Sequence, residues 1–171
     1  GDDLAVSNKQ LEILNGGIFA DGGFDIVIAN PPYIFLSDID KSLLPLYSHR
    51  YKSAEYRYDI YALFFELTLK NLLKNGGCLS YITPHSLLSN RSFSKLREIF
   101  ASKGALLEVI DLGPGVFSNA SNEVQITLAK KCNNIDPSRL FSSRISSRGL
   151  FPKSSFAATL PLSAFYKSPS G

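Results

Sequence analysis

The sequence predicts an α/β fold with a mostly parallel sheet that ends in an antiparallel pair of strands. Short apolar segments rich in β-branched residues alternate with segments of helical periodicity, and this order is typical of strand–helix–strand units. The last two apolar segments, residues 106–112 and 124–130, are joined by a loop too short for a crossover helix, which favours antiparallel pairing. With 171 residues, 44% of them hydrophobic, the chain is large enough to bury one core.

The first expected strand, residues 24–29, is an apolar run that stops at Asn30, Pro31, Pro32 and Tyr33. A short β-branched run of this kind suits a buried, central parallel strand. Because proline cannot donate to a strand ladder, the chain must leave the sheet at this point. Ligands bind at the carboxyl ends of the strands in open α/β sheets, so these four residues are the first candidates for a functional site.

This tetrapeptide offers a defined set of contacts. The side-chain oxygen of Asn30 and the carbonyl oxygen of Pro31 accept hydrogen bonds, and the ring of Tyr33 presents an apolar face. Together they can hold a flat molecule with an NH2 group by its edge and by its face. The alternative interpretation is an ordinary strand-ending turn, since Asn and Pro are common in turns.

Two helices are predicted around a second strand at residues 78–83. Residues 59–75 are apolar around most of the helical circumference, with Asp59 as an N-cap and residues 75–77, Asn-Gly-Gly, as a left-handed C-cap. Residues 86–102 form the other helix, with one apolar face and a glycine two residues beyond its end. Strand, helix, strand, helix predicts parallel pairing with right-handed crossovers.

Composition and cysteine spacing exclude several classes of function. A net charge of +3 permits a polyanionic partner without requiring one. Cys78 and Cys132 are not spaced as metal ligands and neither follows a proline, so we predict no metal site and no Pro-Cys nucleophile. No apolar run reaches membrane-spanning length, and we expect a reduced, cytoplasmic location.

Two further segments have alternative interpretations. Residues 34–57 interleave aromatic and basic side chains, which suits a nucleic-acid strand but equally suits a solvated loop anchored by its rings. Residues 111–115, Asp-Leu-Gly-Pro-Gly, are similar to a nucleotide-binding loop. Such a loop requires a further glycine and a following helix. Residues 116–123 offer neither, so we interpret the segment as the return between two antiparallel strands.

The tetrapeptide after residues 24–29 resembles motif IV of the S-adenosyl-L-methionine-dependent amino-methyltransferases. The closest resemblance is to the DNA adenine-N6 methyltransferases of type IIG restriction-modification systems. It extends over residues 1–131. The segments that resemble the other motifs of that family are residues 1–4 for motif III, 59–64 for motif V, 76–84 for motif VI and 113–117 for motif VIII.

The resemblance implies a partial Rossmann-like methyltransferase fold and roles for individual residues. Residues 30–33 are implied to be catalytic, since Asn30 and Pro31 accept the two N–H bonds of the substrate amine. Tyr33 and Phe117 are implied to stack on the two faces of a flipped adenine, and the alternative interpretation of Phe117 is a core residue. Asp2 is implied to accept the exocyclic amine of the cofactor's adenine. No metal is implied.

The implied function is a site-specific, adenine-N6 DNA methyltransferase of a prokaryotic restriction-modification system. Its cofactor is S-adenosyl-L-methionine and its partner is double-stranded DNA. The same motif IV occurs in N-methyltransferases that act on protein glutamine or on RNA, which is the runner-up. A non-catalytic remnant or interaction module is the third interpretation.

The chain divides into two parts by composition. Residues 1–131 are interpreted as the C-terminal half of a catalytic domain, without the strands that carry the cofactor loop. Residues 132–171 are rich in Ser with scattered Arg and Lys, and are interpreted as a basic connector toward a target-recognition domain in the full-length protein. The chain does not begin with Met, so we expect a piece of a longer protein that is inactive alone.

Overall fold

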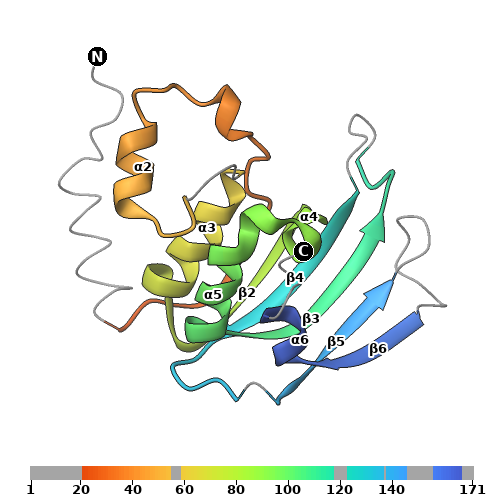
Figure 1. Cartoon of the computed structure of the whole chain (residues 1–171). Helices are drawn as coiled ribbons and strands as arrows, with labels where there is room; N and C mark the ends of the chain where they lie inside the picture. Colours follow the sequence, from red (N-terminus) through yellow and green to blue (C-terminus); the bar gives the residue numbers. More distant parts are fainter. Residues whose placement is uncertain (1–20, 55–58, 118–122, 137, 146–155, 167–171) are drawn as a thin grey trace.

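The computed structural model describes residues 21–54, 59–117, 123–136, 138–145 and 156–166. They form a six-stranded sheet in the order β1-β2-β4-β3-β5-β6, with α3 and α5 side by side along it (Figure 1). β1 pairs with β2 in parallel and β3 with β5 in parallel, whereas β4 is antiparallel to β2 and β3. The strands are β1 (Phe24–Ala29), β2 (Leu73–Pro84), β3 (Gly104–Gly113), β4 (Val124–Lys131), β5 (Leu140–Ile145) and β6 (Phe156–Pro161).

These pairings confirm the expected mixed α/β sheet. β1, β2, β3 and β5 run in the same direction, while β4 and β6 are reversed. The predicted antiparallel pair is β3 with β4, and Gly113 stands opposite Val124 where the connecting loop begins and ends. β4 lies between β2 and β3, so these two parallel strands are joined through it.

The helical elements differ from the prediction in where they end and in continuity. The single helix predicted over residues 86–102 is interrupted at Asn90, whose extended backbone divides it into separate shorter helical elements. The expected helix 59–75 is shorter, because a π-helical turn follows it and β2 already begins at Leu73. Residues 75–77 therefore lie in a strand and do not cap a helix. The helical elements are η2 (Leu36–Asp38), α2 (Leu44–Arg50), α3 (Tyr61–Leu67), η3 (Thr68–Leu72), α4 (Ser86–Ser89), η4 (Arg91–Phe93), α5 (Ser94–Lys103) and α6 (Leu162–Tyr166).

Gly77 shows why the glycine pair belongs to the strand. A Cβ atom at this position would lie 2.8 Å from the carbonyl oxygen of Phe24 and 3.0 Å from that of Asp25. Only glycine lets the backbones of β1 and β2 approach this closely without a shift.

The core lies between the sheet and the helices α3 and α5. Its largest side chains are aromatic, and Phe65 is the central one, with ring centroids 4.8 Å from Tyr81 and 5.4 Å from Phe100. Burying such rings stabilises the fold by roughly 2–3 kcal/mol each. The apolar face predicted for the helix 86–102 is buried as expected, in Phe93, Leu96 and Phe100.

β1 differs from its expected place in the sheet. It was predicted to be a buried central strand, but among the described residues it pairs only with β2 and lies at the end of the sheet. Val27 and Ala29 pack against the core, whereas Ile26 and Ile28 point to the other face and are 64% and 77% exposed. An apolar run shows that a strand forms, but its burial depends on neighbours that the run itself does not specify.

The region interpreted as a basic connector is partly folded onto the sheet. β5 pairs with β3, β6 pairs with β5, and α6 contacts α5. Phe141 and Leu162 are buried in the core, which explains this packing. A link from residues 132–171 to a target-recognition domain stays a prediction.

Cys78 and Cys132 are free thiols, each partly exposed. In the part of the chain that the structure describes, no group of three His, Cys, Asp or Glu residues is arranged to hold a metal ion. Within the same residues, no helix has the length and apolar character needed to cross a membrane.

Candidate active site

Asn30, Pro31, Pro32 and Tyr33 leave the sheet directly after β1 and separate two pockets. Pro31 is buried, Tyr33 is half-buried, and Asn30 and Pro32 are exposed. Pro32 lines an apolar pocket and Tyr33 lines a more polar one. The Asn30 amide has no hydrogen-bond partner among the described residues, so it is available to a bound molecule.

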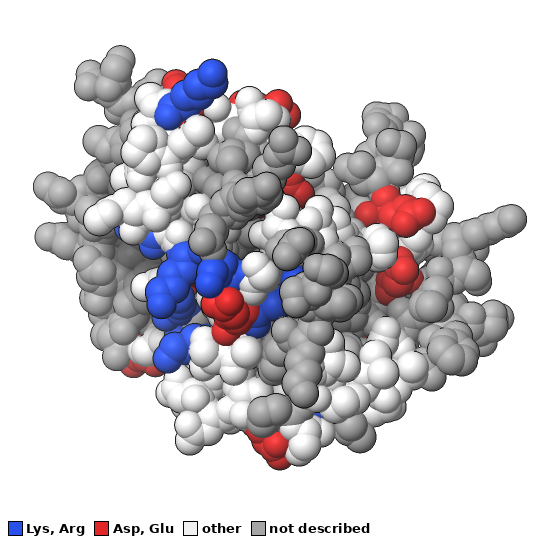
Figure 2. Space-filling view, viewed as in Figure 1, with Lys and Arg blue, Asp and Glu red and all other residues white. Residues whose placement is uncertain are grey.

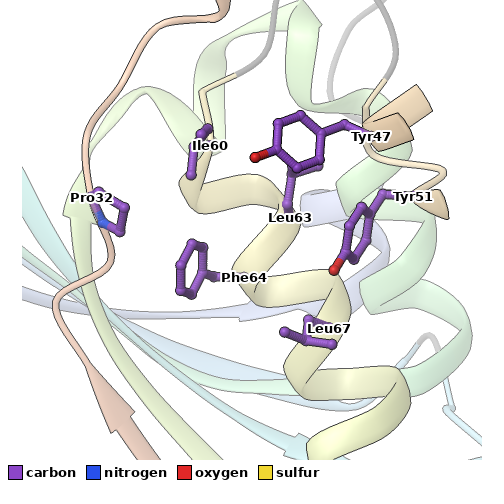
Figure 3. A pocket seen from close by; sticks show the side chains of 7 residues that line it. All are labelled: Pro32, Tyr47, Tyr51, Ile60, Leu63, Phe64 and Leu67. Carbon is purple, nitrogen blue, oxygen red and sulfur yellow. The ribbon is translucent and has the colours of Figure 1, made fainter. Parts of the chain in front are cut away.

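The apolar pocket has a volume of about 330 Å³ and lies between α2, α3 and the chain after β1. Figure 3 shows Pro32 on one side, the side chains of α3 beneath, and two tyrosines of the α2 region on the far side. Phe64 is 37% exposed and faces this space. A flat apolar ring system fits such a pocket, because aromatic and proline side chains offer planar faces. The lining residues are Pro32, Tyr47, Tyr51, Ile60, Leu63, Phe64 and Leu67.

Glu66 of α3 attaches the tyrosine-bearing segment to the core. Its carboxylate is 1% exposed and accepts hydrogen bonds from the backbone N–H groups of Lys52 and Ser53, at 3.0 and 2.7 Å. The Ser53 hydroxyl and the Lys70 ammonium also donate to it. Burial opposes ionisation of Glu66, but these donors outweigh it and hold the pKa of the carboxyl below its ordinary value.

The second pocket lies at the carboxyl end of β2 and has a volume of about 390 Å³. It is more polar, since several of its residues carry carboxyl, imidazole, hydroxyl or amide groups. His85 and Glu123 form a pair in it at 3.8 Å, and the His85 N–H donates to the Glu123 carbonyl at 3.1 Å. The lining residues are Tyr33, Phe35, Asp59, Pro84, His85, Ser86, Asn90 and Glu123.

Tyr33 is held in this pocket by two contacts. Its hydroxyl donates to the carbonyl of Ile82 in β2 at 3.1 Å, and its ring meets Tyr61 edge to face with centroids 6.4 Å apart. Burial raises the pKa of Tyr33, so the hydroxyl stays protonated and keeps donating at neutral pH. The ring is therefore fixed in orientation, as a stacking platform requires.

Arg97 of α5 supports the opposite wall of the polar pocket. It is 4% exposed, and its Nη1 donates to the carbonyls of Leu87 at 3.3 Å and Asn90 at 3.0 Å. Asn90 lines the pocket, so the hydrogen bond from Arg97 to its carbonyl fixes this part of the pocket wall. Burial lowers the pKa of Arg97.

Asp59 does not have the capping role that the sequence predicts. The N-cap of α3 is Ile60, and no side chain makes a capping hydrogen bond there. Asp59 instead lines the polar pocket beside Tyr33. Its backbone forms a bridge with Phe35, which places its side chain at the pocket and not over the helix end.

The structure brings only part of the predicted site together. Phe117 lies half-buried in the loop between β3 and β4 and is not among the residues that line the polar pocket, and its stacking role stays a prediction. The loop does return to this pocket, because Glu123 lines it and Val124 pairs with Pro84. Asp2 lies outside the described residues.

Sequence reasoning missed the apolar pocket. The tyrosines of its outer wall were noted only as possible nucleic-acid contacts or loop anchors, and Phe64 only as part of a helical apolar face. The available signal was the place of Phe64 in residues 59–64, the segment that resembles motif V.

Part of the positive charge of the described residues lies at the end of the sheet opposite the polar pocket. In the face shown in Figure 2, Lys and Arg side chains gather over the helical layer around α5. Lys103 ends α5 and Lys131 ends β4, at the end of the strands opposite the polar pocket. Burial and the nearby charge of Lys103 lower the pKa of Lys131, which donates to the carbonyls of Lys70 and Leu73.

Solved structures with a similar fold define the class of protein. One is a class I S-adenosylmethionine-dependent methyltransferase from Listeria monocytogenes, with a TM-score of 0.57, 19% identity, and coverage of 72% of this chain and 37% of that one. Another is the type IIG restriction endonuclease BpuSI, with a TM-score of 0.61, 15% identity, and coverage of 82% and 19%. The fold is that of the class I methyltransferases.

The family follows from the sequence comparison. The Eco57I restriction-modification methylase family matches residues 3–117, and the chain belongs to this family. The type II restriction enzyme and methyltransferase RM.Eco57I of Escherichia coli is 30% identical over 115 residues, 65% of this chain and 11% of that protein. The type II methyltransferase M.PaeR7I of Pseudomonas aeruginosa is 36% identical over 92 residues, 54% of this chain and 16% of that protein. The predicted resemblance is confirmed.

Proposed function

We propose that this chain contributes the methyl-accepting half of the active site of a restriction-modification DNA methyltransferase. The observation that carries the proposal is that Pro32 lines the apolar pocket and Tyr33 lines the polar one, directly after Asn30 and Pro31 in the chain. A methyl transfer requires that the methyl donor and the accepting amine are held next to each other. This tetrapeptide contacts both pockets and so can hold them together. Family membership and the DNA-acting relatives support DNA as the substrate.

The apolar pocket suits the adenine ring of the cofactor. S-adenosyl-L-methionine is the cofactor expected for this fold, and it supplies an electrophilic methyl group when bound. Pro32 and Phe64 offer apolar faces to a flat ring, and Tyr47 and Tyr51 close the far side. The residues present fit this group, because a purine is planar and the pocket is lined by apolar and aromatic side chains.

Asn30 and Pro31 hold the accepting amine. An exocyclic amine of a nucleobase is a weak nucleophile, since its lone pair is delocalised into the ring. Hydrogen bonds from the two N–H groups to the Asn30 oxygen and the Pro31 carbonyl favour a pyramidal nitrogen with a localised lone pair. The free Asn30 amide is consistent with this role.

The polar pocket receives the base, and we assign adenine as the base. Extracting a base from the duplex costs a few kcal/mol. Each base–aromatic stack returns about 1–3 kcal/mol. Tyr33 alone roughly balances the cost at best, so we propose that Phe117 closes over the second face. Adenine N6 as the target and a target-recognition domain in the whole protein rest on the resemblance to the type IIG enzymes.

A substrate comparison tests this function. The intact protein is incubated with tritiated S-adenosyl-L-methionine and, in turn, with unmethylated genomic DNA, RNA and a release-factor protein. We expect label in DNA only, and nucleoside analysis should place it in N6-methyladenine. Label in RNA or in protein glutamine would contradict the proposal, as would the absence of label from all three.

A further inference from the structure

Asp59 is a buried carboxylate without a side-chain partner among the residues that the structure describes. It is 9% exposed and lines the polar pocket. No hydrogen bond or ion pair joins its side chain to any other residue in the described part of the chain, and it does not cap α3. Buried carboxylates are normally hydrogen-bonded or paired, because an uncompensated charge in the interior is costly. An unpaired one at a pocket wall points to a partner that arrives with the ligand.

The groups that face Asp59 do not neutralise it. Tyr33, from the chain after β1, and Tyr61, from α3, are both phenols, and burial, with a smaller contribution from the charge of Asp59, raises the pKa of Tyr61. His85, after β2, is 3.8 Å from Glu123, which precedes β4. Burial raises the pKa of Asp59, which is the direction expected for a carboxyl with no compensating donor.

We propose that the Asp59 carboxylate faces the substrate base in the polar pocket and stabilises the positive charge that develops on its amine during methyl transfer. This inference rests on the proposed function. As the nitrogen–carbon bond forms and the carbon–sulfur bond breaks, the electron pair of the broken bond stays on sulfur and the amine becomes cationic, and the amine then loses one proton to solvent. A fixed negative charge on the pocket wall is favourable at this moment and unfavourable in the empty protein.

The charge of Asp59 is expected to favour methyl transfer but to lower the stability of the folded protein. Because the folded-state pKa of Asp59 lies above its ordinary value of 3.8, its contribution to stability is full below that pH and is lost as pH rises through the folded-state pKa. At neutral pH the wild-type charge therefore destabilises the fold. Asp59→Asn keeps the size of the side chain and removes the charge, so we expect a higher Tm at pH 7.

The test measures steady-state methylation of unmethylated genomic DNA by the intact protein and by Asp59→Asn. We expect kcat to fall roughly 10- to 100-fold, as for other electrostatic groups of active sites, with the KM for S-adenosyl-L-methionine unchanged. The wild-type kcat should fall as pH drops through the pKa of Asp59, and this acidic limb should be missing in Asp59→Asn. Asp40→Asn is the matched control, because Asp40 is exposed and lines neither pocket.

His85 lines the same pocket, so His85→Gln is measured in parallel and should retain the acidic limb. An active wild type with a kcat for Asp59→Asn within twofold overturns the role of Asp59 alone. A lower kcat that keeps the acidic limb also overturns it, since that result indicates a structural role. A wild type that methylates no DNA refutes the proposed function, and the assignment of Asp59 fails with it.

Discussion

Replacing Glu66 by glutamine tests how the outer wall of the apolar pocket is held. Glu66 accepts two backbone N–H groups and one hydroxyl at 2.7–3.0 Å and pairs with Lys70. Glutamine has one oxygen acceptor where glutamate has two, so its NH2 group takes the place of one oxygen and faces donors that it cannot accept from. The variant therefore loses the ion pair and one hydrogen bond to a charged group, each of about 1.5–3 kcal/mol. The expected destabilisation is about 3–5 kcal/mol, as for other broken buried pairs.

Thermal unfolding followed by circular dichroism measures this loss. For a chain of this size, each kcal/mol corresponds to about 2–4 °C, so Tm should fall by at least roughly 6 °C at pH 7. Glu98→Gln is the matched control, because the exposed pair of Glu98 with Lys95 at 3.2 Å is worth about 0.2–1 kcal/mol.

The pH dependence provides a second check on Glu66. The pKa of a carboxyl stabilised in the folded state lies below its ordinary value, here 4.5. Its stabilisation is present above pH 4.5 and is lost as pH falls through the folded-state pKa. The gap between wild type and Glu66→Gln should therefore close in acid. Equal, small losses in Glu66→Gln and Glu98→Gln, or a gap independent of pH, would refute the reasoning.

Three further substitutions address the two pockets. Tyr33→Phe removes the 3.1 Å hydrogen bond to Ile82 but keeps the ring, so we expect a loss of about 1 kcal/mol in the free energy of unfolding and retained methylation. A loss of activity as large as in Tyr33→Ala would contradict the stacking role of the ring. Phe64→Ala should raise the KM for the cofactor at least about tenfold and leave the KM for DNA unchanged. A raised KM for DNA with an unchanged KM for the cofactor would contradict the assignment of the apolar pocket to the cofactor. Phe117→Ala should change the fluorescence of a base analogue at the target position. An unchanged signal would show that Phe117 does not stack on the base and would favour its interpretation as a core residue.

The strands could be predicted because each is a separate apolar run. The segments found as β1, β2, β3 and β4 all contain the predicted ones, and the loop before Val124 was correctly read as an antiparallel return. Where β1 lies in the sheet could not be read from its own residues, because burial depends on neighbouring elements. β5 and β6 were missed because their polar and small residues weaken the apolar signal.

The site was predictable only where its residues are adjacent in sequence. Asn30 to Tyr33 stand together, so their chemistry was visible at once. The apolar pocket joins Pro32 to Tyr47 and Phe64, and the polar pocket joins Tyr33 to Asp59 and residues after β2, and no local pattern encodes such contacts. Asp59 shows the same limit, because a carboxylate before a helix is usually a cap and only the fold reveals otherwise.

The most direct test of the proposed site is the Asn30→Ala substitution in the intact protein. Because the Asn30 side chain has no partner among the described residues, its removal should leave the Tm within about 1 °C of wild type, as for a surface change. The two measurements are methyl transfer to DNA and the Kd for S-adenosyl-L-methionine. We predict that transfer is abolished while the Kd stays within about threefold, since Asn30 holds the amine and does not line the apolar pocket proposed for the cofactor. Normal turnover by Asn30→Ala would contradict the proposed site.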